Sequence, residues 1–419
     1  MYLKELTNEE FINFTDKFTL KSIYQTPEYG SVMQNQGYTP ILLGLVDEKI
    51  VAASLILIKK ENGFKYAYAP RGFLINYENY NLLNIFTNEI KKYLNKKQVM
   101  GIKINPLIIK SIYNSSNKTA IENPIYEYLF NRLNLNKYYH LGYNNFFESL
   151  NPRFEAVIDL TKPIDEIFNN VKKEYRTKIR TCYKNGIRVY QGNLNDIDAL
   201  ESFTNKKYNY TSSYFKDCYN YFKERNMADL FYAKIDTQTY LTNIQKKLDF
   251  YQEKSDKLNQ EIMLKHKSNP TNLINKKLNV DKYLNQYQND LVFATKMLKE
   301  NPNGIITAAV LTIKQDSEVT ILIDSYDKRF KKLNSKHLLI WQLIQNYRKQ
   351  GFKKFNLGGL SNITTKDNKY SGLNEFKTSF GANVYEYIGD FELITNRRNY
   401  ELYRNFSPLR SIKSKLIKK

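Results

Sequence analysis

The sequence predicts an α/β protein with α+β character, in which one structural unit occurs twice and a helical hairpin is inserted in the second copy. Two observations predict this fold class. Residues 50–59 and residues 305–314 resemble one another, and the same kinds of element follow each of them in the same order. A shared order of elements is typical of an internal repeat. The second copy also contains a long polar stretch that the first copy lacks.

Each copy is expected to contain three strands, an amphipathic helix and a further strand. Short runs of β-branched and aliphatic residues predict the strands, and apolar residues three or four apart predict the helices. In the first copy the elements cover residues 41–46, 50–59, 65–69, 82–95 and 100–104. In the second copy they cover residues 230–235, 305–314, 319–323, 335–350 and 353–357.

The inserted stretch covers residues 236–303 and replaces the tight turn at residues 47–49 of the first copy. Its apolar residues recur at steps of three and four, with Ser255 as the polar interruption, which predicts a coiled-coil seam. A break before Pro270 divides the seam into two similar halves, so we expect an antiparallel coiled-coil hairpin. The seam residues are Leu241, Ile244, Leu248, Tyr251, Leu258, Ile262, Val280, Leu284, Tyr287, Leu291, Ala294 and Leu298.

Between the copies, a linker at residues 142–153 is expected to precede a strand at 156–160 and a helix over 164–184, which Pro163 begins. The expected domains are therefore a first α/β unit, a second unit in two pieces, a hairpin arm and a basic tail. Their boundaries are 1–150, 151–235 with 304–396, 236–303 and 397–419.

Composition limits the classes of partner. The net charge of +22 indicates an anionic partner such as nucleic acid, phospholipid or a pyrophosphate group, although a Lys-rich composition accounts for part of this excess. The tail at 397–419 carries Leu409, Ile412, Leu416 and Ile417 among its basic residues, and either a helix on anionic lipid or a solvated tail fits this pattern.

Composition also indicates a location and argues against some kinds of site. No run approaches the ~20 apolar residues of a membrane span, and the N-terminus lacks the apolar stretch of a signal peptide, so a cytoplasmic location is expected. Two cysteines and three scattered histidines offer neither a disulfide framework nor zinc spacing. We therefore expect no metal site.

The layout of each copy resembles the acyltransferase fold that usually binds acetyl-CoA, the GNAT fold. That fold holds the pyrophosphate of the cofactor with backbone N–H groups of a Gly-rich turn at a helix start. The corresponding turn here, residues 329–334, contains no glycine. The resemblance therefore implies a tandem GNAT-like fold that has lost its CoA site, and no cofactor is expected.

Six motifs in order, together with the arm, resemble the Fem family (FemABX) in its arm-containing branch. They are residues 68–72, 102–106, 175–187, 355–359, 372–377 and 386–391. The resemblance implies an aminoacyltransferase that moves an amino acid from aminoacyl-tRNA to the stem peptide of a peptidoglycan precursor in cross-bridge synthesis. Asn105 departs from the family's common Asp, and Met33 and Tyr210 stand where some members carry basic residues for a nucleotide-linked precursor. The departures at Met33 and Tyr210 favour lipid II as the acceptor, whereas Asn105 bears on how the stem peptide is read.

The implied partners are aminoacyl-tRNA, lipid II, an anionic membrane surface and other Fem-type proteins, and the implied location is cytoplasmic, peripheral to the inner face of the membrane. Two readings without catalysis remain open from the sequence. One is a tRNA- or RNA-binding protein that uses basic and tyrosine side chains. The other is a membrane-peripheral cell-wall adaptor whose arm recruits partners.

The resemblance also implies site residues. It places the active-site lysine at Lys377, beside Phe376, where an ammonium group can stabilise the oxyanion of ester aminolysis. It includes Tyr68 and Asn105 among the substrate-binding residues. Arg71 suits an acceptor phosphate or carboxylate, or else bridges two loops. No Ser-His-Asp or Cys-His set is apparent, so a covalent intermediate is not supported.

Other candidates carry two readings each. Asp324 can orient the attacking amine or cap an element. Gly358 and Gly359 end a strand where backbone approaches either a ligand or its own chain in a tight turn. Lys173, Arg176 and Arg180 lie three or four apart on a helix and can together meet a phosphate, although part of this basic set is solvated.

Overall fold

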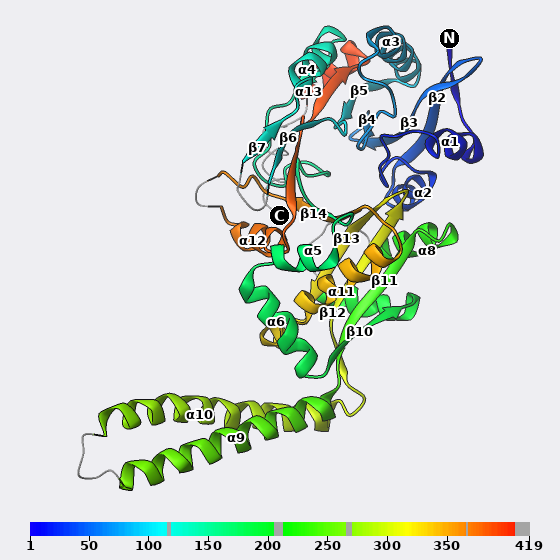
Figure 1. The fold of residues 1–419 in the computed structure, drawn as a ribbon. Coiled ribbons are helices and arrows are strands. Elements are labelled where there is room, and N and C mark those ends of the chain that lie inside the picture. Colours follow the sequence, from blue (N-terminus) through cyan, green and yellow to red (C-terminus); the bar gives the residue numbers. More distant parts are fainter. Residues whose placement is uncertain (115–118, 205–212, 265–269, 366–367, 407–419) are drawn as a thin grey trace.

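The computed structural model describes residues 1–406 apart from residues 115–118, 205–212, 265–269 and 366–367. Two lobes, each built on a β-sheet, lie one above the other in Figure 1, and a pair of long helices projects from the lower lobe. The first sheet has the order β1 (Tyr2–Glu5), β2 (Thr39–Asp47), β3 (Lys49–Glu61), β4 (Phe64–Ala69), β5 (Val99–Ile104), β16 (Phe391–Ile394) and β8 (Tyr139–His140). The second has the order β10 (Ile187–Gly192), β11 (Ala228–Ile235), β12 (Ile305–Gln315), β13 (Glu318–Tyr326), β14 (Lys354–Leu360), β9 (Phe154–Asp159), β15 (Asn383–Tyr387), β6 (Ile109–Tyr113) and β7 (Ala120–Glu122).

Helices cover both sheets. They are α1 (Asn8–Thr15), α2 (Pro27–Asn35), α3 (Tyr80–Lys96), α4 (Tyr126–Leu135), α5 (Ile164–Asn170), α6 (Lys173–Lys184), α7 (Ile197–Thr204), α8 (Tyr214–Glu224), α9 (Thr237–Leu264), α10 (Thr271–Glu300), α11 (Ser335–Lys349), α12 (Ser371–Thr378) and α13 (Arg397–Phe406), with short 3-10 helices at Leu194–Asp196 and Lys328–Leu333. Among the described residues, no helix is both long and apolar enough to cross a membrane.

The duplicated unit is confirmed by the strand order of the two sheets. In each sheet four antiparallel strands precede one parallel pair, which is β4 with β5 in the first and β13 with β14 in the second. The helix between the two parallel strands is α3 in the first copy and α11 in the second. Parallel strands need such a crossover connection, and its position after the third hairpin strand is the same in both copies.

Three apolar clusters stabilise this arrangement. Phe86 and Ile90 of α3 are fully buried against the first sheet, and Leu339 of α11 is fully buried against the second. The third cluster joins the lobes, since Val32 of α2 and Phe222 of α8 belong to it. Fully burying a large apolar side chain stabilises the fold by roughly 1.5–3 kcal/mol, so this shared cluster holds the lobes together.

The two cysteines lie inside these clusters. Cys182 packs in the second lobe and Cys218 between the lobes, and both thiols are free and buried. Burial raises the pKa of Cys182 to about 12. Both thiols therefore stay protonated at neutral pH, which fits structural side chains.

The sheets exchange strands across the expected domain boundaries. Strands β6 and β7 precede residue 150, yet they pair in the second sheet, where β6 lies beside β15. Strand β16 precedes residue 396, yet it pairs with β5 of the first sheet through Leu393 and Ile102. In Figure 1 this C-terminal strand returns to the upper lobe beside β5. The division at 1–150 and at 151–235 with 304–396 stays a prediction, and the sequence analysis did not anticipate this exchange.

The single helix expected over residues 164–184 is wrong, because the chain forms α5 and α6 with a break between them. Val171 is buried and extended, with ψ of 133°. The N–H of Lys172 donates to the carbonyl of Ser379 at 2.9 Å instead of to a helical partner. No proline or glycine marks this break, so the helical pattern alone predicted one continuous helix.

The inserted stretch forms the arm, α9 and α10, which lie side by side in Figure 1. The helices are antiparallel, because Thr237 contacts Asn301 at the base and Ser255 donates to Asp281 farther out, at 2.8 and 2.6 Å. Every predicted seam residue is buried or half-buried. The interlocking packing that defines a coiled coil stays a prediction. At the base, Ile244 and Ala294 join the core of the second lobe.

The expected basic tail is described in part. Helix α13 covers Arg397–Phe406. Leu409, Ile412, Leu416 and Ile417, which suggested a lipid-facing stripe, lie outside the described residues, as does Tyr210.

Candidate active site

The two parallel pairs differ at their carboxyl ends. Strands β4 and β5 pair up to Ala69 and Ile104, the last residue of each. The ladder between β13 and β14 ends at Thr320 and Asn356, although both strands continue for several residues. We call this gap, between residues 321–326 and residues 357–360, the splay. Backbone groups that a ladder leaves unpaired are available to a ligand, so the splay is a candidate site that the first copy does not have.

Two glycines line the splay for different reasons. Gly358 has φ of +78°, which favours glycine, and it lies in a bulge of the pairing between β14 and β9. A Cβ atom added to Gly359 would lie 2.4 Å from Cγ of Pro152, so the linker packs directly on this residue. The close approach predicted at Gly359 is therefore made by the chain itself.

Lys377 reaches into the splay from α12. Asn374 and Lys377 lie one turn apart on the same face of this helix, and Asn374 fixes the helix by accepting from the N–H of Ser361 at 3.1 Å. Nζ of Lys377 donates to the carbonyl oxygen of Gly359 at 2.8 Å. The side chain is 7% exposed. Burial lowers the pKa of Lys377 to about 8, against the opposing effect of the Asp324 carboxylate.

This geometry gives Lys377 a defined chemical capacity. An ammonium group has three N–H donors, and one of them is engaged by Gly359. At neutral pH, below its pKa of about 8, the group is mostly charged. It can therefore offer charge and further hydrogen bonds to an oxyanion that forms beside it in a site shielded from water.

Asp324 and Phe376 flank the lysine. The carboxylate of Asp324 forms an ion pair of 2.5 Å with Lys336, in the first turn of α11. The ammonium of Lys336 lies 4.4 Å from the ring centroid of Phe376. His337 packs against the same ring, and burial lowers the pKa of His337 to about 4, so this imidazole is neutral at physiological pH. The predicted neighbours of Lys377 are thus brought together.

The first-copy candidates form a separate buried network at the end of β4 and β5. Oδ1 of Asn105 accepts from the N–H of Arg71 at 2.7 Å and from the hydroxyl of Tyr68 at 3.2 Å. Tyr68 in turn accepts from Asn151 at 2.9 Å. Asn105 therefore holds the turn at Arg71, where φ is +53°. Nδ2 of Asn105 is buried without a hydrogen-bond partner among the described residues.

Arg71 connects this network to the second sheet. Its guanidinium donates to Glu155 at 2.5 Å and to the carbonyl of Pro152 at 2.8 Å, and it lies 4.4 Å from the ring centroid of Tyr387. The side chain is 2% exposed. Of the two readings that the sequence left open, bridging between segments is observed. Binding of a substrate by Arg71 stays a prediction.

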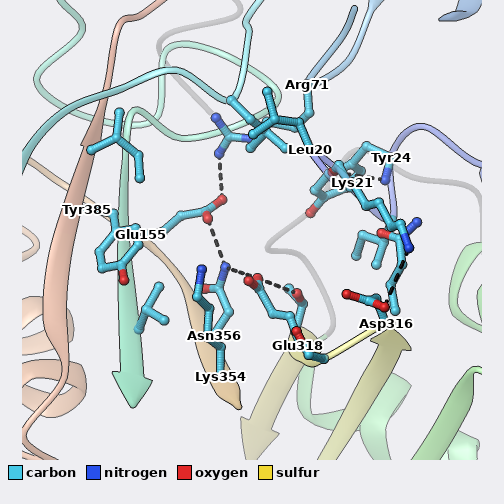
Figure 2. A pocket seen from close by; sticks show the side chains of 18 of the residues that line it. Leu20, Lys21, Tyr24, Arg71, Glu155, Asp316, Glu318, Lys354, Asn356 and Tyr385 are labelled. Carbon is cyan, nitrogen blue, oxygen red and sulfur yellow. Dashed lines mark hydrogen bonds and ion pairs between the residues drawn. The ribbon is translucent and has the colours of Figure 1, made fainter. Parts of the chain in front are cut away.

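A cavity of about 180 Å³ lies where the lobes meet, and residues of both lobes line it. In Figure 2, Glu155 and Tyr385 lie on one side, and Lys21 and Asp316 lie on the other. Sequence reasoning missed Glu155 and Glu318. Asn356 lies in the motif at residues 355–359, but the motif implies no role for it. The available signal for Glu155 was a carboxylate directly before the apolar strand predicted at residues 156–160.

The basic helix α6 lies close to Phe376, the neighbour of Lys377, through the side chain of Tyr175. Arg176 and Arg180 flank the ring of Phe168 at 6.0 and 5.4 Å, while Lys173 is exposed one turn earlier. Tyr175 on the same helix lies 6.1 Å from the ring of Phe376. Tyr175 therefore connects the buried face of α6 to Phe376, whereas Arg176 and Arg180 lie around Phe168 of α5. No group of three or more potential metal-binding side chains occurs among the described residues.

Comparison with known proteins agrees with this architecture. The model of the FemAB family matches residues 6–407. An aminoacyltransferase FemA of Staphylococcus aureus is 25% identical, and one of Staphylococcus epidermidis is 24% identical. The alignments cover 100% and 98% of this chain, and 100% of each relative. A crystal structure of FemX covers 97% of the chain and all of FemX, with a TM-score of 0.73 and 20% identity, so the fold is shared.

These findings decide two predictions made from the sequence. The relatives confirm that the chain is an aminoacyltransferase. The family model spans nearly the whole chain. The chain belongs to the FemAB family.

Proposed function

We propose that this enzyme transfers an amino acid from aminoacyl-tRNA to the stem peptide of lipid II, and that the reaction takes place in the splay. Aminoacyl transfer in peptidoglycan cross-bridge synthesis is the activity that the family and the aminoacyltransferase relatives support. The observation that carries the choice of site is the buried ammonium of Lys377 in a gap between two strands.

The chemistry is aminolysis of an ester. The acceptor amine attacks the ester carbon, a C–N bond forms, and the carbonyl oxygen becomes an oxyanion. The C–O bond to the tRNA ribose then breaks, and the proton lost by the amine ends on the ribose oxygen, which leaves as a hydroxyl group. An ester is already activated, so positioning and stabilisation of the oxyanion are the main requirements. Lys377 supplies the cation in this proposal.

The positive charge of the chain supports aminoacyl-tRNA as the donor, and the burial of Met33 supports lipid II as the acceptor. The net charge of +22 and the cations Lys173, Arg176 and Arg180 of α6 favour a tRNA donor. Met33 is 3% exposed in the core between the lobes, so this position offers no charge to a nucleotide diphosphate. That absence favours lipid II over a soluble UDP-linked precursor. A membrane-bound acceptor places the enzyme at the inner, anionic face of the membrane, and the arm remains free to contact tRNA or another Fem-type protein.

The test is an assay in which lipid II is incubated with the protein and a set of radiolabelled aminoacyl-tRNAs. We expect label to appear in lipid II with at least one donor, and far less label in a UDP-linked precursor at equal concentration. Binding of tRNA without any transfer would instead support a non-catalytic RNA-binding protein, and preferred labelling of the soluble precursor would contradict the proposed acceptor.

A further inference from the structure

Three side chains from neighbouring strands form one wall of the cavity between the lobes. They are Glu155 on β9, Asn356 on β14 and Glu318 on β13, and we call them the carboxylate wall. Nδ2 of Asn356 donates to Glu155 at 2.8 Å and to Glu318 at 3.1 Å, as Figure 2 shows. A primary amide has two N–H donors. Both donors of Asn356 are therefore used to hold two carboxylates close together.

The two carboxylates differ in how their charge is balanced. Glu155 is neutralised by Arg71 at 2.5 Å and also accepts from the hydroxyl of Tyr387 at 3.0 Å. Within the part of the chain that the structure describes, Glu318 accepts from two neutral groups, the amide of Asn356 at 3.1 Å and the hydroxyl of Thr320 at 3.4 Å. Among the described residues, no cation lies within ion-pair distance of Glu318. Burial, together with the nearby charge of Glu155, raises the pKa of Glu318.

The other cations that line the cavity form no ion pair with Glu318 among the described residues. Lys21 is paired with Asp316 at 3.5 Å on the opposite side. Lys354 lies opposite Glu318 in the ladder, and its charge opposes the rise in the pKa of Glu318. Its side chain is exposed, however, and its ammonium lies 5.8 Å from the ring centroid of Tyr385. Tyr24, Tyr385 and Tyr387 contribute aromatic rings to the lining. A carboxylate among aromatic rings is an arrangement that favours an organic ammonium ion and disfavours an anion.

The carboxylate wall adjoins the splay through one residue. Oδ1 of Asn356 accepts from the N–H of Gly358 at 2.8 Å. A Cβ atom added to Gly358 would lie 3.5 Å from Nζ of Lys377. The volume of about 180 Å³ far exceeds the ~10–15 Å³ that one water molecule requires. The cavity therefore has room for a small organic group next to the site where the ester is expected.

We propose that the carboxylate wall binds a primary ammonium group of a substrate amino-acid residue, with Glu318 as its counter-ion. The inference rests on the proposed function, because both substrates of that reaction carry such a group. One source is the α-ammonium of the amino acid on the donor, and the other is the amine of the acceptor stem peptide. Lys377 repels an ammonium group, so we expect that group at the carboxylate wall, next to the splay.

The experiment is a calorimetric titration at neutral pH with two pairs of probes. The donor pair is 3′-deoxy-3′-(glycylamino)adenosine and its N-acetyl derivative. The acceptor pair is a synthetic pentapeptide with a lysine side-chain amine and the same peptide acetylated at that amine. We expect one pair to show at least about tenfold weaker binding after acetylation, which identifies the source of the ammonium group. Glu318→Gln should abolish this difference.

Asp316→Asn is the matched control, because Asp316 is a carboxylate of the same cavity that already has a lysine partner. We expect this variant to retain the preference for the free amine. Retention of that preference in Glu318→Gln would overturn the proposal. Failure of both free amines to bind wild type better than their acetylated forms would also overturn it, and this comparison remains decisive if Glu318→Gln does not fold.

The titration also separates this inference from the proposed function. Binding of a free amine that depends on Glu318, without any transfer to lipid II, would leave the inference standing and contradict the proposed reaction. Transfer to lipid II, together with equal binding of the free amine by wild type and Glu318→Gln, would support the proposed reaction and contradict the inference.

Discussion

Lys377 is a cation that the folded protein shields from water, and burial lowers its pKa from 10.5 to about 8. Below pH 8 the folded and unfolded chains both hold this proton, whereas between pH 8 and 10.5 only the unfolded chain holds it. The free energy of unfolding therefore rises with pH across this window. We predict that Lys377→Met is more stable than wild type at pH 7 by about 1–3 kcal/mol, and that the difference shrinks above pH 8.

Urea unfolding of both proteins between pH 7 and 9.5 measures this difference. Lys328→Met is the control, since Lys328 is exposed and its removal should change stability little at any pH. Equal stability of Lys377→Met and wild type at every pH would show that the fold tolerates the buried charge without cost.

The ion pair between Arg71 and Glu155 allows a second test by stability, because a bridging role and a substrate-binding role of Arg71 predict different free energies of unfolding. Arg71→Met leaves a buried carboxylate without its cation, so we predict a loss of roughly 3–5 kcal/mol. The double variant Arg71→Met with Glu155→Gln should recover part of that loss. Chemical unfolding measures both variants, and Lys162→Met, which breaks an exposed pair with Glu166, should cost at most about 1 kcal/mol.

Kinetics with lipid II then distinguish the two roles of Arg71. If Arg71→Met is as stable as wild type and raises only the KM for lipid II, Arg71 binds the acceptor. The predicted loss of stability is then wrong. A loss of stability that the double variant recovers in part assigns Arg71 to the junction between the lobes.

At the scale of elements, the arm has two parts with different roles in stability. Its base packs into the second lobe through Ile244, Ala294 and Met297. The helix α9 has 28 residues, so at ~1.5 Å per residue it extends for about 42 Å and most of it lies beyond the lobe. We predict that replacing residues 249–288 with a short Gly-Ser turn leaves cooperative unfolding and the melting temperature nearly unchanged.

The matched change at the base is Ile244→Ala, which opens a cavity in the core and should cost roughly 2–5 kcal/mol. Calorimetric melting compares the two proteins. A loss of cooperativity on removal of residues 249–288 would show that the distal arm is part of the folding unit. An unchanged stability of Ile244→Ala would contradict the core role of the base.

The two copies of the repeat differ in their elements, and only part of this difference was predictable from the sequence. The repeat, its helices and the arm were predictable, because apolar periodicity reports local structure. The splay was not predictable, because the parallel ladder ends at Thr320 and Asn356, and the point where two distant strands stop pairing is set by tertiary contacts. The break at Val171 escaped for a similar reason, because the partner of Lys172 is Ser379, 207 residues away.

At the scale of the whole molecule, the excess of positive charge should govern donor binding. Neutralising tRNA phosphates with Lys and Arg releases condensed counterions. The logarithm of the affinity therefore falls linearly with the logarithm of the salt concentration, and the slope is proportional to the number of phosphate contacts. We predict a steep fall in tRNA affinity between ~50 and ~200 mM salt. The triple variant of Lys173, Arg176 and Arg180 to Gln should reduce the slope of log affinity against log salt by about 2–3.

Filter binding of charged tRNA at several salt concentrations measures this slope. The control is a triple variant of Lys91, Lys92 and Lys96 to Gln on α3 of the first lobe, which preserves the change in net charge. Equal slopes for the two triple variants would show that α6 is not the tRNA site.

The site itself was predictable residue by residue only where the family resemblance applied. Lys377, Phe376, Asp324, Gly358 and Gly359 come together at the splay, as a shared active site requires. Tyr68, Arg71 and Asn105 gather at the end of the other parallel pair. The residue that joins the groups, Glu155, lies on β9, directly before the strand that the sequence predicts at residues 156–160. Such long-range pairs follow from the packing of two lobes, which local patterns do not report.

The central claim is that Lys377 stabilises the oxyanion of aminoacyl transfer to lipid II in the splay. Single-turnover transfer from radiolabelled aminoacyl-tRNA to lipid II, measured for wild type and Lys377→Ala across pH 6.5–9, tests it most directly. We predict a rate about 10²–10³-fold lower for the variant, with little change in KM for lipid II. The ratio of the two rates should fall as the ammonium is lost above pH 8. A ratio that rises through this pH range would indicate a general base, and equal rates for two folded proteins would contradict the claim.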